Sequence, residues 1–334
     1  MKKKHSVAPP TPWQRLVQML HYESRIINYI FLYALFIGLL GLSLPLGITA
    51  VFNLLSNGSM YSSTYILIAI ILVGVVIGGI LLIAQLTLVE SLEQKIFAKA
   101  AVEFAYRLPR IKQQELEGEN VPELINRFFD VSTIQKGLSK LLVNFVASGV
   151  QVVFSVILLS LYHPIFIAFG AVTILAILFV VLLYFRRGVN TSIQESEHKY
   201  EVVAFLEEVG AELELYRGDP EASGKIVSRT DEITANYLKA RNNHFRILKR
   251  FFASSVILRT FLLGGLLLVG SFLVVSRQMT FGQFVASEVI IVQISYAVEK
   301  LMTSFDTIFD MVTGSEKLAV ITDLELKEEV PAHG

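Results

Sequence analysis

Few residues in this sequence could carry out catalysis or bind a metal ion. It contains no cysteine, which excludes thiolate metal sites, cysteine nucleophiles and disulfides. The six histidines are scattered, and no pair of them has metal-ligand spacing with a carboxylate on one helix face. Asp306 and Asp310 lie four residues apart, but they follow the last apolar run and fit a solvated helix face. We therefore expect neither a catalytic centre nor a metal site.

A phosphate-binding loop is the next chemistry that a short motif can reveal. No G-x-x-x-x-G-K-[ST] motif occurs in the sequence. The nearest match runs from Gly218 to Lys225, where the glycines are too far apart and Ile226 replaces the hydroxyl residue. It also falls in an expected helical hairpin tip, whereas a phosphate loop follows a strand. The sequence predicts that this chain binds no ATP, Mg²⁺ or other cofactor and hydrolyses no ATP by itself.

Polar side chains inside long apolar runs are the best candidates for function. Glu288 lies about two turns into the last run, and Gln293 follows it. Asn144 and Gln151 lie one heptad apart on one helix face, and Gln85 lies near the end of an earlier run. Ionisable groups in a membrane usually face a bundle interior or a water-filled cavity. We take these five as candidate transport-path residues. Hydrogen bonding between helices is the alternative explanation, above all for the amides of the earlier runs.

These apolar runs are long enough to cross a bilayer. Hydrophobic residues make up 53% of the chain and charged residues 17%, against about 45–50% and about 25% in soluble proteins. A run of roughly 20 apolar residues spans a hydrocarbon core of about 30 Å. The sequence predicts an all-α membrane protein, with a kink at Pro45 in the first span. The expected spans cover residues 26–52, 65–89, 141–161, 165–185, 256–276 and 281–301.

The connections between the spans alternate in length and charge. Residues 90–140 and 186–250 are long and rich in Lys and Arg, whereas the other three connections are short and nearly free of them. The positive-inside rule places both long connections and both termini in the cytoplasm. We therefore expect a cytoplasmic segment over 1–25, a six-helix membrane domain over 26–324 and a polar tail over 325–334. A bacterial inner (plasma) membrane is the expected location.

A short amphipathic helix precedes the first span. Thr11 and Pro12 form an N-cap followed by proline at the first helical position. Trp13, Leu16 and Val17 then share one face, as expected for a helix at the membrane surface. A cytoplasmic helix packed on the protein is the alternative.

The two long connections continue the spans as helices. After Val89 the apolar pattern becomes amphipathic, with no Gly or Pro before Pro109, and the same happens after Phe185. We therefore expect two helical hairpins that project into the cytoplasm, with tips over 109–122 and 210–224.

This arrangement resembles the transmembrane domain of ABC exporters. Residues 205–210 and 279–284 are similar to the segments that precede the family's second cytoplasmic tip and its sixth helix. The first cytoplasmic loop of the family resembles residues 108–131, although 120–122 look like a small insertion. The matching residues there are Leu108, Pro109, Gly118, Glu119, Arg127, Asp130 and Val131.

The resemblance implies a homodimer or heterodimer of such domains around a central cavity, with ABC ATPase domains docked on the hairpin tips and no nucleic-acid partner. ATP and Mg²⁺ would then bind to the ATPase domains. That domain would begin near Glu325, so we expect it on a separate chain or beyond a truncation. The expected docking residues are Gln113, Gln114, Glu115, Leu116, Glu117, Gly118 and Glu119 at the first tip, and Ala211, Glu212, Leu213, Glu214, Leu215, Tyr216 and Arg217 at the second.

Two other functions stay open at this stage. A regulatory membrane protein could use the same fold without transporting anything, and recovery of an ATPase partner would distinguish the two. An ion-coupled secondary transporter is the third, although it needs no long cytoplasmic hairpins. The sequence leaves the substrate undetermined.

Overall fold

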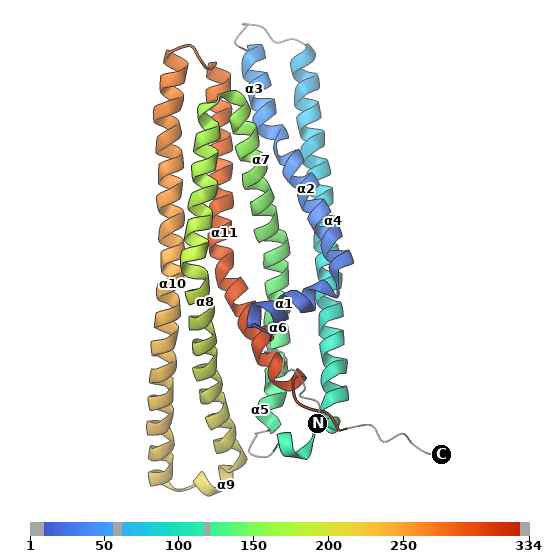
Figure 1. Cartoon of the computed structure of the whole chain (residues 1–334), viewed down its shortest axis with the longest axis vertical. Coiled ribbons are helices and arrows are strands. Elements are labelled where there is room, and N and C mark those ends of the chain that lie inside the picture. Colours follow the sequence, from blue (N-terminus) through green and yellow to red (C-terminus); the bar gives the residue numbers. More distant parts are fainter. Residues whose placement is uncertain (1–9, 56–61, 117–120, 328–334) are drawn as a thin grey trace, which may run out of the picture.

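The computed structural model describes residues 10–55, 62–116 and 121–327. In these residues every element is a helix, apart from one isolated antiparallel bridge between Ile111 and Leu326. The helices form one elongated bundle, with the short turns at one end and the long hairpins at the other (Figure 1). Six candidate membrane spans lie along it, as the sequence predicts.

The first span consists of two helices. α2 (Ser24–Gly41) and α3 (Ser43–Leu55) meet at Leu42. The break lies three residues before Pro45, in the turn that a proline disrupts, which agrees with the kink predicted from Pro45. Pro45 has no N–H with which to bond the carbonyl of Gly41, and its ring disfavours a helical carbonyl there. The helix is therefore interrupted one turn before the proline.

The second span continues into the first hairpin as one helix. α4 (Ser62–Arg107) is a single helix of 46 residues, which confirms that the second span continues far past Val89. Short helices turn the chain back, and a π-helical stretch leads into the third span. The elements of this return are η1 (Leu108–Arg110), η2 (Gln113–Glu115), α5 (Val121–Asn126), η3 (Arg127–Phe129), α6 (Asp130–Ser139), η4 (Lys140–Phe145) and α7 (Val146–Tyr162).

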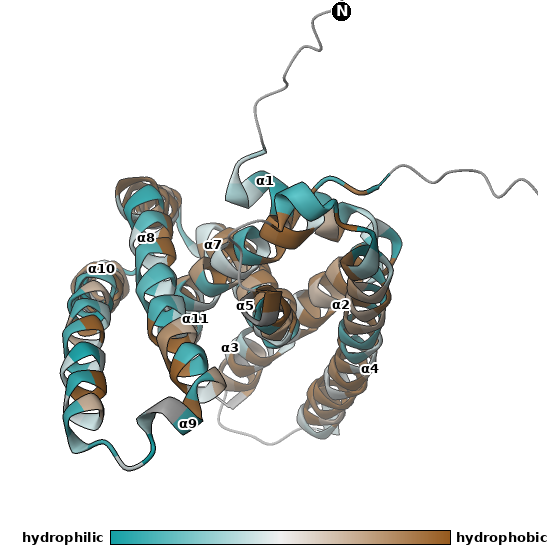
Figure 2. Ribbon diagram, turned by 90° about the horizontal axis from the view of Figure 1, so that it is seen from below, coloured by the Kyte–Doolittle hydropathy of each residue, from teal (hydrophilic) through white to brown (hydrophobic). Residues whose placement is uncertain are grey.

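The second hairpin is longer and simpler. α8 (Ile165–Ala211) and α10 (Pro220–Val275) pack side by side, joined by α9 (Leu213–Tyr216). At about 1.5 Å per residue, the 56 residues of α10 extend roughly 84 Å, well beyond a bilayer core. The tip is shorter than predicted, because Asp219 caps α10 and the helix already includes Gly224. Seen from the hairpin end, the near ends of α8 and α10 are largely hydrophilic (Figure 2).

The last helix, α11 (Phe281–Thr322), forms the centre of the bundle. It contacts α10, α7, α6, α3, α1 and α8. Half of its most apolar stretch is buried, whereas none of the corresponding stretch of α4 is. α11 therefore joins the two hairpins to one core.

α1 (Pro12–His21) crosses the bundle on the hairpin side (Figure 1). Thr11 and Gln14 form a reciprocal capping box at its start, which confirms the predicted helix and its cap. Leu16 is buried against the protein, while Trp13 and Val17 stay exposed. The helix therefore packs on the protein, and contact of its exposed side with a membrane surface stays a prediction.

Candidate functional site

Three of the predicted transport-path amides are bonded within the bundle. Gln85 is fully buried, and its Nε2 donates to the carbonyl of Ile30 on α2 at 3.3 Å. Gln151 on α7 donates to Gln293 Oε1 on α11 at 3.2 Å and to Ser155 Oγ at 3.1 Å. The bonds from Gln85 to Ile30 and from Gln151 to Gln293 join neighbouring helices, as the alternative explanation of buried amides requires, whereas the bond to Ser155 lies within α7.

Glu288 is the ionisable residue among the five. Its Oε1 is buried and has no hydrogen-bond partner among the described residues, and the same is true of Gln85 Oε1. A carboxylate in a membrane span that lacks a partner is costly unless water, a cation or another subunit reaches it. Asn144 is half-buried in the π-helical stretch before α7. Of the five candidates, Glu288 is therefore the one whose position most needs a function.

The second hairpin tip presents an acidic and partly apolar surface. Ala211, Glu212, Leu213 and Glu214 are exposed, and Leu213 is an apolar side chain facing solvent. Tyr216 is only half-exposed, and its hydroxyl donates to Glu212 Oε2 at 3.4 Å. Arg217 pairs with Glu214 at 2.7 Å.

The first hairpin tip is described only in part. Gln113 and Gln114 are exposed, and Glu115 is half-buried. Leu116 packs against the small core of Phe104, Leu124 and Ile321. The remaining predicted docking residues of this tip, Glu117, Gly118 and Glu119, lie outside the described residues. At the second tip, the side chain of Leu215 is also outside what the structure describes.

The glycine pair near the second tip does not form a phosphate loop. Gly218 adopts a φ of +83° in the turn before α10. Asp219 then caps that helix, accepting from the N–H groups of Glu221 and Ala222 at 2.9 and 3.2 Å. A phosphate would need these same N–H groups. Within the described part of the chain there is also no group of three or more His, Asp or Glu residues suited to a metal ion.

A buried hydrogen bond ties the two hairpins together. Tyr200 on α8 donates to Asp130 Oδ2 on α6 at 2.5 Å, and both residues are less than one-tenth exposed. Lys199 and Lys317 lie over the Tyr200 ring at 5.1 and 5.7 Å. Asp130 belongs to the motif in the first loop, but its partner lies 70 positions away, so the sequence alone did not reveal the pair.

A second set of contacts joins the first hairpin to Glu23 and to the segment after α11. Glu23, the N-cap of α2, is buried and bonds Lys95 at 2.5 Å and also Lys99, both on α4. The segment after α11 forms the bridge between Leu326 and Ile111, and Lys112 pairs with Glu325 at 2.5 Å. Lys95 and Lys99 share a helix face by their spacing of four, but nothing in the sequence identifies Glu23 as their partner.

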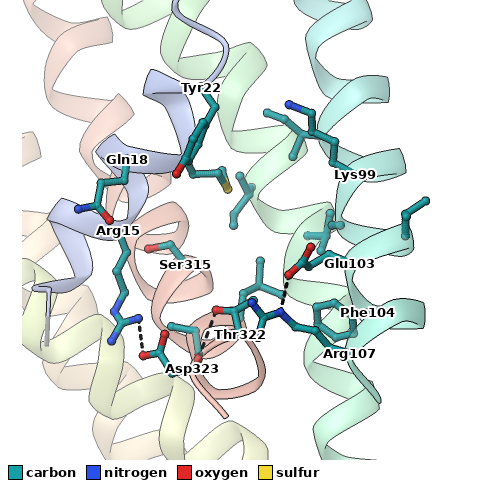
Figure 3. Close-up of a pocket in the computed structure, with 18 of the residues that line it drawn as sticks. Arg15, Gln18, Tyr22, Lys99, Glu103, Phe104, Arg107, Ser315, Thr322 and Asp323 are labelled. Atoms are coloured by element: carbon teal, nitrogen blue, oxygen red, sulfur yellow. Dashed lines mark hydrogen bonds and ion pairs between the residues drawn. The ribbon is translucent and has the colours of Figure 1, made fainter. Parts of the chain in front are cut away.

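A cavity of about 940 Å³ lies between α1, α4, α6 and α11. Figure 3 shows its charged side chains, with Arg15 bonded to Asp323 on one side and Arg107 to Glu103 on the other. Its walls are otherwise mainly apolar, with Met19, Ile134 and Leu318 among them. The cavity therefore combines an apolar wall with ion pairs contributed by α1, α4 and the residue after α11.

A comparison of the sequence with known protein families agrees with this fold. Among curated proteins no match is found. The family described as the ABC transporter transmembrane region matches residues 27–213, more than half of the chain, and includes both hairpin tips up to Leu213. The chain is therefore a member of the ABC transporter transmembrane region family.

Proposed function

We propose that this chain is the permease domain of an ATP-driven exporter. In this role it forms a substrate pathway together with a second transmembrane domain, and ATPase domains drive it through the two hairpin tips. The observation that carries the proposal is the length of the helices. α4, α8, α10 and α11 each run without a break from the membrane region into the hairpin end.

Such helices act as levers. A displacement at a hairpin tip is transmitted along a helix that bends little, so closure of a pair of ATPase domains can change the packing of the spans. Roughly 30 Å of each helix is needed to cross the hydrocarbon core. The rest of α8 and α10, which are joined by the exposed tip 211–217, serves the coupling to ATP.

The tip residues suggest how an ATPase domain is held. Leu213 is an exposed apolar side chain flanked by exposed carboxylates, which suits an apolar pocket with a basic rim on the partner. Tyr216 is partly covered and bonds Glu212. Its role in this proposal is to hold the tip in shape, and it does not insert into the ATPase domain. Gln113 and Gln114 provide the corresponding exposed surface on the first tip.

The experiment is site-specific photo-crosslinking in membranes of the cells that encode the chain. A photoreactive amino acid replaces Gln114 or Leu213 at the tips, and His163 in the opposite turn serves as the matched control. We expect an ABC ATPase domain to be captured from both tip positions and not from position 163. The recovered complex should hydrolyse ATP when reconstituted, and the purified chain alone should not.

Two outcomes would reject the proposal. Efficient crosslinks at both tips to proteins without an ATPase domain would favour a regulatory protein with the same fold. ATP-independent, ion-coupled transport by the purified chain would favour a secondary transporter.

A further inference from the structure

Five basic residues lie at one level on the exposed sides of the second hairpin. Thr191 of α8 bonds His244 of α10 at 2.9 Å, and the rings of Tyr184 and Phe251 meet edge to face with centroids 5.7 Å apart. These contacts fix the antiparallel register of the two helices, which places the five basic residues within about 6 Å along the hairpin axis. We call them the basic band, and they are Arg186, Arg187, Arg246, Lys249 and Arg250.

The basic band lies at the depth of phospholipid headgroups. The predicted fourth span ends at Phe185, directly before Arg186. A headgroup layer adds about 5–8 Å to each side of the hydrocarbon core. The height of the band therefore matches the thickness of this layer.

On the membrane side of the band, the exposed side chains are apolar. Leu183 precedes Arg187 by four residues on α8, and Ile257 follows Arg250 by seven residues on α10, so each shares a helix face with its arginine. Leu183 is 45% exposed and Ile257 is 70% exposed. Each of these arginines therefore stands at the end of an apolar stripe, which suits a ligand with a charged end and a hydrocarbon body.

The positive charge of the band is not balanced by carboxylates. Residues 165–194 and 233–275 contain no Asp or Glu. Among the described residues, no carboxylate lies within ion-pair distance of the five basic side chains. On the first hairpin, by contrast, Lys95 and Lys99 share the carboxylate of Glu23. The positive-inside rule accounts for cations on this side of the membrane, but it does not require that they lack partners.

Two of the arginines flank one aromatic ring. The guanidinium of Arg250 lies 5.9 Å from the centre of the Tyr184 ring, and Arg187 follows Tyr184 by about one turn of α8. Guanidinium groups present planar sets of N–H donors that match the oxygens of a phosphate. Tyrosine is common at the boundary between membrane and water. These three residues form the centre of the basic band.

We propose that the basic band binds the headgroups of anionic phospholipids, with Arg187 and Arg250 holding the phosphate. The acyl chains lie along the apolar stripes that contain Leu183 and Ile257. A zwitterionic headgroup binds less tightly, because its ammonium group offsets the charge of its phosphate. Bound lipid attaches the base of the second hairpin to the leaflet on that side. This inference depends on the membrane spans and not on the proposed export function.

The test is native mass spectrometry of the purified full chain, titrated with phosphatidylglycerol or with phosphatidylcholine of the same acyl chains. We expect phosphatidylglycerol to bind more tightly by roughly tenfold or more, since each cation near an anionic lipid contributes roughly fivefold. Arg187→Gln and Arg250→Gln should each weaken phosphatidylglycerol binding roughly fivefold, and together roughly 25-fold, without changing phosphatidylcholine binding.

Two control variants separate charge from position. Arg187→Lys combined with Arg250→Lys keeps both charges and should retain most of the preference for phosphatidylglycerol. Lys239→Gln removes an exposed cation of α10 that lies about 15 Å along the helix from Lys249. This distance exceeds the Debye length of about 10 Å at 0.1 M salt, so lipid binding should be unchanged.

Three results would overturn the inference. They are equal affinity for the two lipids, an unchanged preference in the Gln variants, and displacement of phosphatidylglycerol by millimolar inorganic phosphate, which would assign the band to a free anion. A dimer that dissociates in the Gln variants, while the lipid preference stays unchanged, would assign the arginines to contact with a second copy of the chain. Both side chains are exposed, so we expect the variants to fold.

Discussion

The two hairpins of this protein are attached in different ways. The first is tied along its length: Glu23 bonds α4 from the side, and the segment after α11 forms a bridge with Ile111 near the tip. The second is held to α11 near its base, where Gly188 meets Phe309 and Ser192 Oγ bonds Thr313 Oγ1 at 2.8 Å. Below that level its ion pairs are local, such as Arg229 with Glu232.

This difference separates two mechanical roles. Movement at the start of α2 or in the segment after α11 reaches the first hairpin directly, because Glu23 pairs with α4 and the segment after α11 shares an ion pair and backbone bonds with residues 110–112. The second hairpin can tilt as a unit about its base. The bond between Asp130 and Tyr200 joins the two hairpins to each other. The following variants weaken these attachments one by one.

The base of the second hairpin should be the most sensitive position. A methyl group at Gly188 would overlap the Phe309 ring, which is fully buried and has no room to move. We expect Gly188→Ala to lower the free energy of unfolding by roughly 1–3 kcal/mol, as overpacking of a core usually does. Unfolding in mixed detergent micelles, followed by circular dichroism, measures it.

Two other glycines provide matched controls for that variant. Gly210→Ala lies on the same helix with no atom near the new methyl group, so the change should be neutral or slightly stabilising. At Gly137, on the first hairpin, the methyl group would meet Met311, which is as fully buried as Phe309, so a comparable loss is expected there. Equal results for Gly188→Ala and Gly210→Ala would contradict the role of the contact between Gly188 and Phe309.

Loss of the hydrogen bond between the two hairpins should have the next largest effect on stability. Tyr200→Phe removes the hydroxyl that bonds Asp130 and leaves a buried carboxylate with one donor fewer. Such a loss costs about 1–3 kcal/mol. We expect ATP-driven transport to fall as well, because the hairpins would move less closely together. A double-mutant cycle with Asp130→Asn measures the coupling, and additive effects would show that the pair transmits nothing.

The side attachment of the first hairpin should have a smaller effect that depends on pH. Hydrogen bonds from Lys95 and Lys99 lower the pKa of the Glu23 carboxyl below its ordinary value of 4.5. The stabilisation is therefore fully present above about pH 4.5 and is lost as the pH falls through the lower pKa of the folded state. Both lysines are about half-exposed, so we expect Glu23→Gln to cost only about 1 kcal/mol at pH 7. Melting temperatures measured over a series of pH values should show this loss of stability at acidic pH in the parent chain and not in the variant.

The bridge near the first tip should tolerate loss of its ion pair. Lys112 and Glu325 are both well exposed, and such pairs contribute roughly 0–1 kcal/mol. Glu325→Gln should therefore leave stability almost unchanged. The backbone bonds from Lys112 N to Glu325 O at 3.0 Å and from Lys327 N to Arg110 O at 2.7 Å should persist. Hydrogen exchange of those two amides checks this, and rapid exchange in the variant would assign the bridge to the ion pair.

Much of this architecture could be predicted from local patterns. The six spans, the continuation of α4 past Val89 and the cap at Thr11 follow from hydrophobic periodicity and capping chemistry, which act within a few residues. The break at Leu42 also follows from a local pattern, because the effect of Pro45 falls on the preceding turn.

The contacts between distant segments could not be predicted in the same way. Glu23 with Lys95, and Asp130 with Tyr200, join residues 72 and 70 positions apart. Their pairing depends on which helix faces meet, and that is decided by the packing of the whole bundle. Glu288 was identified from its type and position alone, whereas the pairing of Glu299 with Arg259 depends on the orientation of α11 against α10.

The central claim is that both hairpins project into the cytoplasm from a six-span domain. The chain has no cysteine, so single cysteines can be introduced without background. In intact cells, an impermeant thiol reagent should label cysteines at His163 and Gln278, whose side chains meet at 3.2 Å between the two short turns. Cysteines at Gln114 and Asp219, at the hairpin tips, should react only after the membrane is opened. Labelling of either tip from outside intact cells would contradict the account.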